Sequence, residues 1–379
     1  MKKELDVVYV THDSLSEGIG MSQIVPLLIG LSNKGFRVGV ISCEKVSPPR
    51  ALRETLIQSG ILWKPINFGR FGALGGVGRI LRIASKLPKA SVYHCRGDIS
   101  ATATSLRTRS PFIWDVRGLW LDQKIILSNL GRAKFIIRIA KLLEKRAATK
   151  ASAVTTLTAA VYPVLLRRHP GLTHKHSVIP TCVDLIKFPF IPDLPKEKNL
   201  LLSGVFNNYY DLDKTKLFIS RIKKELDITI TWCHGKEADR QTLEVGEEVI
   251  KTMIQTEMPA EIANASFGVA FCKEDAGESL LGVMPTKVAE FLATGRPVVV
   301  SRGIGDLGGI LTKHQAGIIL DQNVDKAIQE LKELLVDPKM PIRCRKLAEE
   351  HFSMEKAIDA YYAILIELIK STSRLPNAQ

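Results

Sequence analysis

The chain has 379 residues, of which 45% are hydrophobic and 24% charged. This length predicts two domains, and this composition is typical of a soluble globular protein. Six scattered cysteines argue against a disulfide framework. The sequence also contains no signal-peptide pattern and no apolar stretch that approaches about 18 residues, so we expect a cytoplasmic protein without a transmembrane helix.

The formal net charge of +14 is unevenly distributed. Residues 1–190 contain 29 Lys and Arg against 11 Asp and Glu, which gives +18. Residues 191–379 contain 24 against 28, which gives −4. This asymmetry favours an anionic partner for the first half, although a basic protein can also be simply soluble and basic.

Strand and helix signals alternate through the first half. Short β-rich apolar runs predict strands at residues 5–11, 36–42, 90–97, 111–118, 153–158 and 176–180. A helix is expected over residues 22–35, where Gly35 is suited to cap its C-terminus. Strands that alternate with helices predict a parallel sheet covered on both faces.

The second half repeats this layout. Strands are predicted at residues 199–204, 228–235, 265–272, 296–301 and 316–320. The proline-rich, charged stretch 188–199 predicts a linker between the halves. The chain ends in an amphipathic helical pattern, so we expect domains at 1–190 and 198–352 and a final helix at 353–372.

The segment GVMPTKVAEFLATGRPVVVS (282–301) is the strongest chemical signal. Pro285 suits the first position of a helix, and Gly295 suits its C-terminal cap. A helix that starts in a loop between strands offers free N–H groups and a positive dipole end to a diphosphate. Glu290, further along, can accept hydrogen bonds from a ribose diol. The alternative is a capped helix with a surface glutamate.

This segment resembles the donor-site signature of retaining GT-B glycosyltransferases, known as glycosyltransferase group 1 or family 4. Residues 178–188 (VIPTCVDLIKF), 351–365 (HFSMEKAIDAYYAIL) and 18–42 also resemble that family, in the family's order. The resemblance implies an α/β GT-B fold, with two Rossmann-like domains whose parallel sheets face each other across a cleft. It implies that 1–190 binds the acceptor, that 198–352 binds the nucleotide sugar, and that the helix 353–372 returns to the first domain.

By position, the resemblance assigns Glu290 to the ribose hydroxyls and the preceding loop to the sugar and diphosphate. Lys287 is a candidate cation, with a solvated surface lysine as the alternative. Gly18 and Gly20 would allow a first-domain loop to approach the phosphates, because glycine has no Cβ; the alternative is a turn without a ligand. The predicted donor-binding residues are Gly18, Gly20, Gly204, Lys214, Glu278, Gly282, Val283, Met284, Pro285, Thr286, Lys287 and Glu290.

Two positions depart from the family pattern. The family often has a second glutamate eight residues before the helix glutamate, and Gly282 stands there instead. Sugar recognition is therefore open, with Glu278 as a nearby candidate. The family also places an arginine just after the glycine that corresponds to Gly204, and Val205 stands there. Lys214 or Lys216 is a candidate for the diphosphate if this loop is longer than usual.

Polar residues also follow two predicted strands of the first domain, where loops line the ligand crevice of a parallel sheet. We predict Asp115 and Arg117 as catalytic residues. His94, Arg96 and Asp98 are predicted acceptor contacts, since arginine suits bidentate binding of an anionic group. The alternatives are an internal Asp115–Arg117 salt bridge and a structural, hydrogen-bonded His94.

Residues 131–150 predict a helix with a basic face. At about 100° per residue, one arc holds Lys134, Arg138, Lys141 and Lys145, and the roughly opposite side holds Phe135, Ile139, Leu142 and Leu143. Such a helix can lie on anionic lipid. The alternative is a core helix with a solvated basic face.

Taken together, these features predict a glycosyltransferase that moves a sugar from a UDP- or GDP-linked donor to a hydroxyl of an anionic or lipid-linked glycan, with retention, as in polysaccharide biosynthesis. It would be cytoplasmic and peripheral on the inner face of the membrane. We expect no cofactor or metal beyond the nucleotide-sugar co-substrate, and no nucleic acid partner, because aromatics are scarce. A GT-B-fold nucleotide-sugar epimerase and a catalytically weak GT-B binding protein are the alternatives. The donor sugar, base, acceptor and linkage are open.

Overall fold

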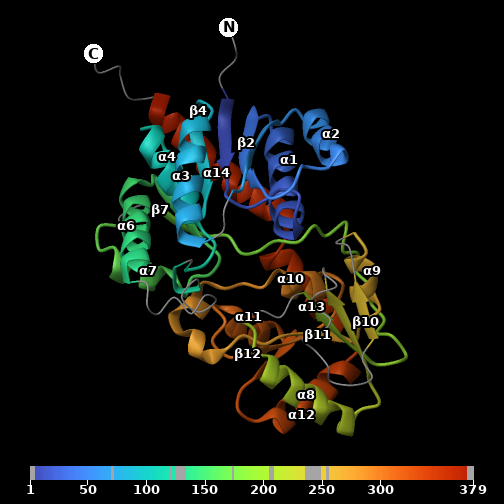
Figure 1. Ribbon diagram of the computed structural model, residues 1–379. Coiled ribbons are helices and arrows are strands. Elements are labelled where there is room, and N and C mark those ends of the chain that lie inside the picture. The colour runs from blue at the N-terminus through green and yellow to red at the C-terminus, as the bar shows by residue number, and fades with distance from the viewer. Residues whose placement is uncertain are drawn as a thin grey trace, which may run out of the picture. The chain divides into compact units, whose positions relative to one another are not determined.

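The computed structural model describes residues 5–69, 72–119, 121–123, 134–172, 175–204, 209–234, 249–252 and 256–373 (Figure 1). The chain forms two compact α/β units. The first unit comprises Met1–Leu121, Leu130–Ile179 and Met354–Gln379, and the second comprises Asp122–Asn129 and Pro180–Ser353. The last stretch of the chain therefore belongs to the first unit.

The first unit contains a seven-stranded sheet in the order β3-β2-β1-β4-β5-β6-β7. Every neighbouring pair is parallel, as the alternation of strands and helices predicts. The strands are β1 (Leu5–Val10), β2 (Val38–Glu44), β3 (Leu62–Asn67), β4 (Ala90–Arg96), β5 (Phe112–Val116), β6 (Ala153–Thr156) and β7 (Lys175–Val178).

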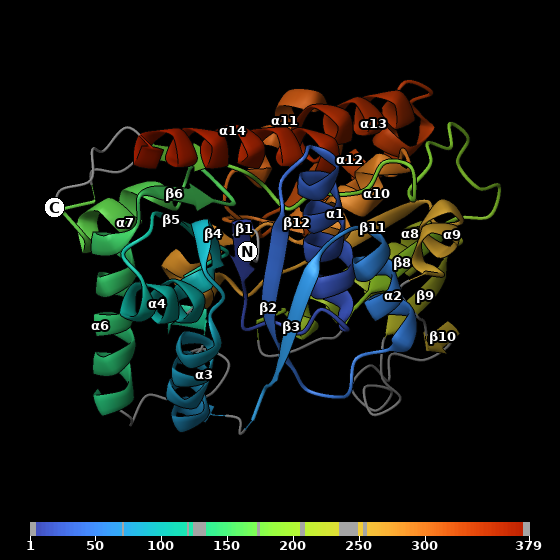
Figure 2. The ribbon, with the colours of Figure 1, turned by 90° about the horizontal axis from the view of Figure 1, so that it is seen from above.

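Helices cover both faces of this sheet. Figure 2 shows α3, α4 and α6 beside one another on one face, and α14 packs against α1 on the other. The helices are η1 (Gly20–Ile24), α1 (Val25–Asn33), α2 (Arg50–Gln58), α3 (Gly72–Lys86), α4 (Gly97–Arg107), α6 (Lys134–Lys150), α7 (Tyr162–Arg168) and α14 (Met354–Ser373).

The second unit contains a six-stranded parallel sheet in the order β10-β9-β8-β11-β12-β13. Its core is built around Trp232, Phe218 and Phe267, all fully buried. The strands are β8 (Asn199–Ser203), β9 (Thr229–His234), β10 (Val249–Thr252), β11 (Phe267–Ala270), β12 (Val298–Ser301) and β13 (Gly317–Leu320).

In this unit α8 and α12 pack together on one face of the sheet, and α10, α11 and α13 pack on the other (Figure 1). The helices are α8 (Leu212–Glu225), α9 (Met258–Ala263), η4 (Glu274–Gly282), α10 (Thr286–Ala293), α11 (Leu307–His314), α12 (Val324–Val336) and α13 (Met340–His351). Among the described residues, no helix has both the length and the apolar character needed to cross a bilayer.

The linker predicted at 188–199 is tied to the second unit by the buried side chain of Arg296. Its guanidinium donates hydrogen bonds to the carbonyl of Ile191 over 3.0 Å and to that of Asp193 over 2.9 Å. A third bond, over 2.8 Å, reaches the carbonyl of Ala263 at the end of α9. The linker is therefore held directly after the C-terminus of α10, the helix of the predicted donor site.

Candidate functional site

Helix α10 starts between two buried strands of the second unit. The chain leaves β11, passes through the 3-10 segment η4, and reaches α10 after a three-residue loop. Pro285 precedes the first helical residue, with φ −65° and ψ 126°, so it is one position earlier than the sequence predicts. Gly295 has φ +84° after the helix, as a C-terminal cap requires. The predicted order of loop, helix and strand is thus confirmed.

The loop before α10 is fixed by hydrogen bonds. The hydroxyl of Thr181 donates to the carbonyl of Met284 over 2.7 Å. The carbonyl of Leu280 accepts from the amides of Val283 and Gly305, over 3.1 and 2.9 Å. The first-turn amides of α10 begin at Thr286. The amide of Val288 donates to the carbonyl of Pro285 over 3.1 Å, and a helix gives the amides of Thr286 and Lys287 no intrahelical acceptor. Together with the dipole, they form a preorganised anion-binding end.

Glu290 and Lys287 lie one helical turn apart on α10, and both side chains are half-buried. Burial raises the pKa of Glu290 to about 7, and the neighbouring Lys287 opposes this shift. Burial lowers the pKa of Lys287 to about 8, although Cys272 and Glu290 act in the other direction. The Lys287 ammonium lies 4.6 Å from the centre of the Tyr210 ring. Two shifted, oppositely charged groups thus lie on the same helix as the anion-binding end.

Four other predicted donor residues of this unit are Gly204, Lys214, Glu278 and Gly282. Gly282 is buried at the end of η4, and Glu278 is exposed on the same segment. Gly204 adopts φ +95° after β8, and a Cβ there would meet nothing within 4 Å. The ammonium of Lys214 lies 2.7 Å from a carboxylate oxygen of Glu274. Val205 lies outside the described residues.

The glycine loop of the first unit is fixed by Glu44 at the end of β2. This buried carboxylate accepts hydrogen bonds from the hydroxyls of Ser14 and Ser16 and from the amide of Leu15. A Cβ at Gly20 would lie 2.2 Å from the carbonyl oxygen of Ser14, whereas one at Gly18 would meet nothing within 4 Å. Position 20 therefore needs a glycine because a side chain would collide with the loop's own backbone. Gly18, in contrast, is exposed to solvent.

Asp115 is fully buried at the end of β5 and accepts four hydrogen bonds. Oδ2 is 3.2 Å from Nε2 of His94 and 3.0 Å from Nε of Arg117. Oδ1 accepts from the hydroxyls of Thr155 and Tyr361, over 2.9 and 3.1 Å. Burial alone would raise the pKa of Asp115, but Arg117 and His94 hold it far below the usual range. Asp115 is therefore ionised and enclosed, which favours a positioning role, and its predicted catalytic role with Arg117 stays a prediction.

The three predicted acceptor contacts lie next to this network. His94 is fully buried, with its ring 4.4 Å from that of Tyr9 and 4.5 Å from that of Tyr361. Burial lowers the pKa of His94, against the effect of Asp115. Arg96 donates from Nε to Asp13 over 2.9 Å, and Asp98 accepts from the indole of Trp114 over 3.0 Å. All three side chains are buried, so none of them offers an exposed polar group to an acceptor.

The basic helix α6 is only partly as predicted. Arg138, Lys141 and Lys145 are exposed together on its surface. Leu142, which was predicted to pack on the opposite side, is 60% exposed. Among the described side chains of α6, Glu144, Ala147 and Ala148 are buried and the predicted Ile139 and Leu143 are half-buried; the helix packs against α4. The side chains of Lys134 and Phe135 lie outside the described part of the chain.

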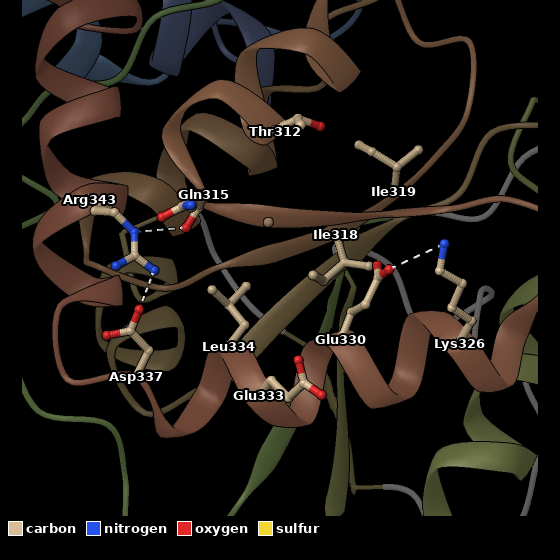
Figure 3. Close-up of a pocket in the computed structure, with 11 residues that line it drawn as sticks. Thr312, Gln315, Ile318, Ile319, Lys326, Glu330, Glu333, Leu334, Asp337 and Arg343 are labelled. Atoms are coloured by element: carbon tan, nitrogen blue, oxygen red, sulfur yellow. Dashed lines mark hydrogen bonds and ion pairs between the residues drawn. The ribbon is translucent and has the colours of Figure 1, made fainter.

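A hollow of about 680 Å³ lies elsewhere in the second unit, lined by residues of α11, β13, α12 and α13 (Figure 3). Its charged side chains face one another: Arg343 is 2.7 Å from Asp337, and Lys326 is 3.6 Å from Glu330. None of the predicted donor-binding residues lines it. It is therefore separate from the predicted donor site.

Several residues that shape the candidate sites are absent from the sequence-based prediction. Glu44, Thr155, Thr181 and Tyr210 contribute through contacts with residues far away in the sequence. Glu44 alone carries a usable signal, because a carboxylate at the end of a fully buried strand is unusual and lies at the ligand-binding edge of a parallel sheet.

No protein-family model and no curated protein sequence matches this chain. Solved structures do resemble it. Sucrose-phosphate synthase from Thermosynechococcus elongatus superposes with a TM-score of 0.73 at 13% identity, over 97% of this chain and 100% of that one. HepE from Anabaena, in complex with UDP and glucose, gives 0.66 at 11% identity over 98% and 100%. The lipopolysaccharide outer core galactosyltransferase WaaB gives 0.62 at 12% identity over 97% and 100%.

At such identities the likeness establishes the fold. The chain has the GT-B fold of these glycosyltransferases, with two α/β units that each contain a parallel sheet. The fold class predicted from the sequence is confirmed at this level.

Proposed function

We propose that this chain is a nucleotide-sugar-dependent glycosyltransferase whose second unit binds the donor at the N-terminal end of α10. One observation carries the proposal: the Glu290–Lys287 pair, with shifted pKa values near 7 and 8, lies on a helix whose first turn follows a fixed loop of a GT-B fold. A surface helix without a ligand has no need for two half-buried ionisable groups at this point.

Each group has a defined role in this proposal. The Glu290 carboxylate accepts hydrogen bonds from the ribose hydroxyls of the nucleotide. The first-turn amides of α10 and the Lys287 ammonium bind the diphosphate, whose charge keeps Lys287 protonated. Transfer then depends on stabilising the departing nucleoside diphosphate, which needs hydrogen-bond donors and positive charge at the leaving group. We propose retention of configuration on the basis of the sequence resemblance.

UDP is the first nucleotide to test. Solved structures of HepE contain UDP, UDP with glucose, or UDP-glucose. These ligands belong to HepE. For this chain they are the first ligands whose binding should be measured. Of the three carboxylates on η4, we assign the exposed Glu278 to the sugar hydroxyls, because position 282 has a glycine instead of the family's glutamate.

The acceptor in this proposal is anionic and is bound by the first unit. Arg79 is buried, with its guanidinium 4.1 Å from the centre of the Phe68 ring, and Arg82 donates to the Phe68 carbonyl over 2.8 Å. Burial lowers the pKa of Arg79, and the charge of Arg82 lowers it further. These two guanidinium groups belong to the part of the chain, residues 1–190, that carries 29 Lys and Arg against 11 Asp and Glu, and this excess of positive charge is our reason for proposing an anionic acceptor.

The donor site is tested by calorimetric titration of the protein with UDP, GDP and ADP. We expect one nucleotide to bind, and Glu290→Ala to weaken its affinity roughly 10- to 100-fold, since hydrogen bonds to a charged group contribute about 1.5–3 kcal/mol. Glu330→Ala, on α12 of the same unit, is the control and should bind normally. If no nucleotide binds, or if both variants bind like the wild type, the proposed donor site is wrong.

The epimerase alternative is separated by product analysis. The protein is incubated with the nucleotide sugar that binds, without any acceptor. A glycosyltransferase leaves the sugar configuration unchanged and at most hydrolyses the donor slowly. Accumulation of an epimeric nucleotide sugar would instead assign the chain to the other reaction.

A lipid-linked acceptor requires the protein to reach a membrane surface. The exposed Arg138, Lys141 and Lys145, with the exposed Leu142 beside them, form a basic and apolar face suited to anionic lipid. Flotation with phosphatidylglycerol vesicles should recover the protein, and phosphatidylcholine vesicles should not. Equal recovery with both vesicles, or no loss of flotation when the three cations are replaced by glutamine, would count against this part of the proposal.

A further inference from the structure

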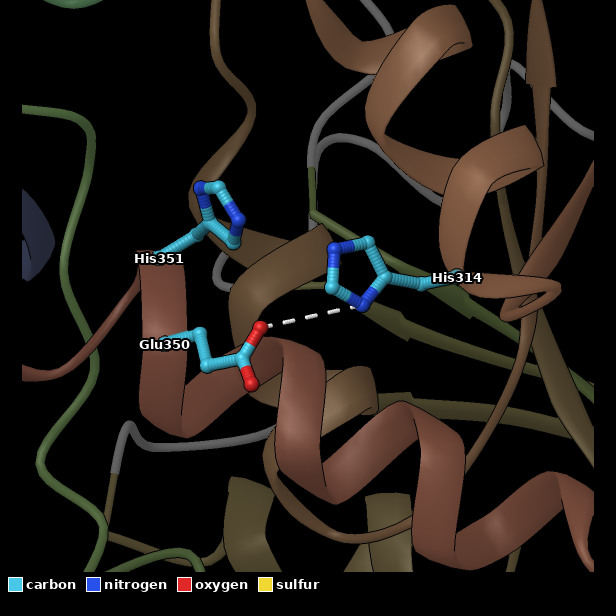
Figure 4. Close-up of side chains that lie close together, drawn as sticks. All are labelled: His314, Glu350 and His351. Atoms are coloured by element: carbon cyan, nitrogen blue, oxygen red, sulfur yellow. Dashed lines mark ion pairs between the residues drawn. The ribbon is translucent and has the colours of Figure 1, made fainter.

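We infer that His314, Glu350 and His351 form a binding site for a divalent transition-metal ion, such as Zn²⁺, that joins α11 to α13 in the second unit. One ligand atom of each side chain lies within 4.8 Å of the other two. Figure 4 shows the three side chains directed toward a shared space, with the histidine at the end of α11 facing the two neighbours at the end of α13. The site lies outside the donor helix and goes beyond the proposed function.

The contacts of His314 favour an ion at this cluster. Nδ1 of His314 is 3.9 Å from Oε2 of Glu350, which is too long for a hydrogen bond. Nε2 of His314 is buried and has no hydrogen-bond partner among the residues that the structure describes. Oε2 is therefore the Glu350 oxygen that faces His314, and Oε1 is 3.8 Å from the ammonium of Lys346. A buried imidazole nitrogen without a partner is costly, and a metal bond would satisfy it.

The helix termini provide a second reason for a cation here. His314 is the last residue of α11, and His351 is the last residue of α13. The carbonyl ends of both helices carry partial negative charge, which favours a cation near each terminus. The two rings approach edge to face, with centroids 5.4 Å apart. Two negative helix ends and one carboxylate therefore converge on the same space.

The ligand chemistry selects the class of metal. Two imidazoles and one carboxylate are typical ligands for Zn²⁺ and similar transition metals, whereas Mg²⁺ and Ca²⁺ prefer oxygen atoms alone. A tetrahedral zinc ion with bonds of about 2.0–2.1 Å holds its ligand atoms roughly 3.4 Å apart, so side-chain rotations that move these atoms by about 1 Å would close the site. Water would fill the fourth position.

Such an ion would act as a clamp within the second unit. Helix α13 also donates from Arg345 to the carbonyl of Ala293, the last residue of α10, over 2.9 Å. Helix α11 follows Gly305, whose amide donates to the carbonyl of Leu280 in η4, the segment that precedes the loop before α10. The clamp therefore holds together two helices that support the donor helix, and it contributes stability without taking part in transfer.

Equilibrium binding of Zn²⁺, and of Co²⁺ by visible absorption, tests the inference on tag-free protein. We expect one ion per chain and a Co²⁺ spectrum with ligand-field bands, because ligation by imidazole and carboxylate with low symmetry makes these bands intense. His314→Ala, His351→Ala and Glu350→Gln should each weaken binding at least about tenfold. Glu349→Gln, the adjacent carboxylate that pairs with Arg345, is the matched control and should bind like the wild type.

Thermal unfolding provides the second measurement. At a hundredfold excess of Zn²⁺ over its Kd, Tm should rise by roughly 5 °C in the wild type and in Glu349→Gln. It should not rise in His314→Ala or His351→Ala. Each variant is first checked for nucleotide binding, so that a folding defect is separated from loss of a ligand. The inference is overturned if the wild type binds no ion, or if the histidine variants bind Zn²⁺ as tightly as the wild type.

Discussion

The hydroxyl of Tyr361 donates a hydrogen bond to Oδ1 of Asp115 over 3.1 Å, and so connects the last helix of the chain to the central sheet of the first unit. The two residues are 246 positions apart. Tyr361 also packs its ring on His94, which bonds to the other oxygen of Asp115. Helix α14 is thereby part of the polar network that surrounds the candidate acceptor residues.

This bond predicts the effect of removing one hydroxyl. Tyr361→Phe should lower the free energy of unfolding by about 1.5–3 kcal/mol, because a buried carboxylate loses one of its four donors. Tyr362→Phe is the matched control, since the neighbouring ring packs against Phe36 and is only half-buried. Urea-induced unfolding measures both. Equal stability of the two variants would show that α14 is held by apolar packing alone.

Gly20 and Gly18 should respond differently to the same substitution. Gly20→Ala places a methyl group 2.2 Å from the carbonyl oxygen of Ser14, so the loop must shift at a cost of about 1–3 kcal/mol. Gly18→Ala has open space and should change stability by less than about 0.5 kcal/mol. Thermal unfolding of the two variants checks this. A larger loss for Gly18→Ala would contradict the packing described for the loop.

Donor binding should depend on pH through Glu290. The pKa of this carboxyl is raised to about 7, so it is mostly protonated at pH 6 and mostly ionised at pH 8. Because only the ionised form accepts hydrogen bonds from both ribose hydroxyls, the affinity for UDP-glucose should rise up to about tenfold over this range. UDP-glucose is the suitable probe, since its diphosphate diester does not titrate there. Glu290→Gln should remove this rise and leave only the roughly twofold fall toward pH 8 that is expected as Lys287, with a pKa of about 8, loses its proton. A rise that persists in that variant would assign it to another group.

Lys287 should affect the diphosphate rather than the ribose. Lys287→Met is expected to weaken UDP binding roughly 10-fold or more and to weaken uridine binding much less, because uridine has no phosphate. Lys224→Met, an exposed lysine in the last turn of α8, is the control and should leave both affinities unchanged. Calorimetric titration with the two ligands measures the difference. Equal losses for UDP and uridine would mean that Lys287 supports the helix rather than the phosphates.

Edge strands show why part of the fold could not be predicted locally. The central strands of both sheets are predicted by their apolar runs, and the structure confirms them. Strands β3 and β10, at the edges of the two sheets, are missed. β3 carries Lys64 and Pro65 and has exposed positions, so its pattern does not have the continuous apolar character of a central strand.

The sequence by itself determined the alternation of strands and helices, the cap at Gly295 and the position of Glu290 on a helix that begins in a loop. These features follow from local rules: apolar periodicity, glycine at positive φ and the free amides of a helix start. The tertiary structure alone decided that Asp115 is enclosed by four donors and that Glu290 and Lys287 are desolvated. The tertiary structure also brings His314 of α11 close to His351 of α13. Burial and long-range contacts set these properties, and no local pattern encodes which distant groups exclude water from a charge.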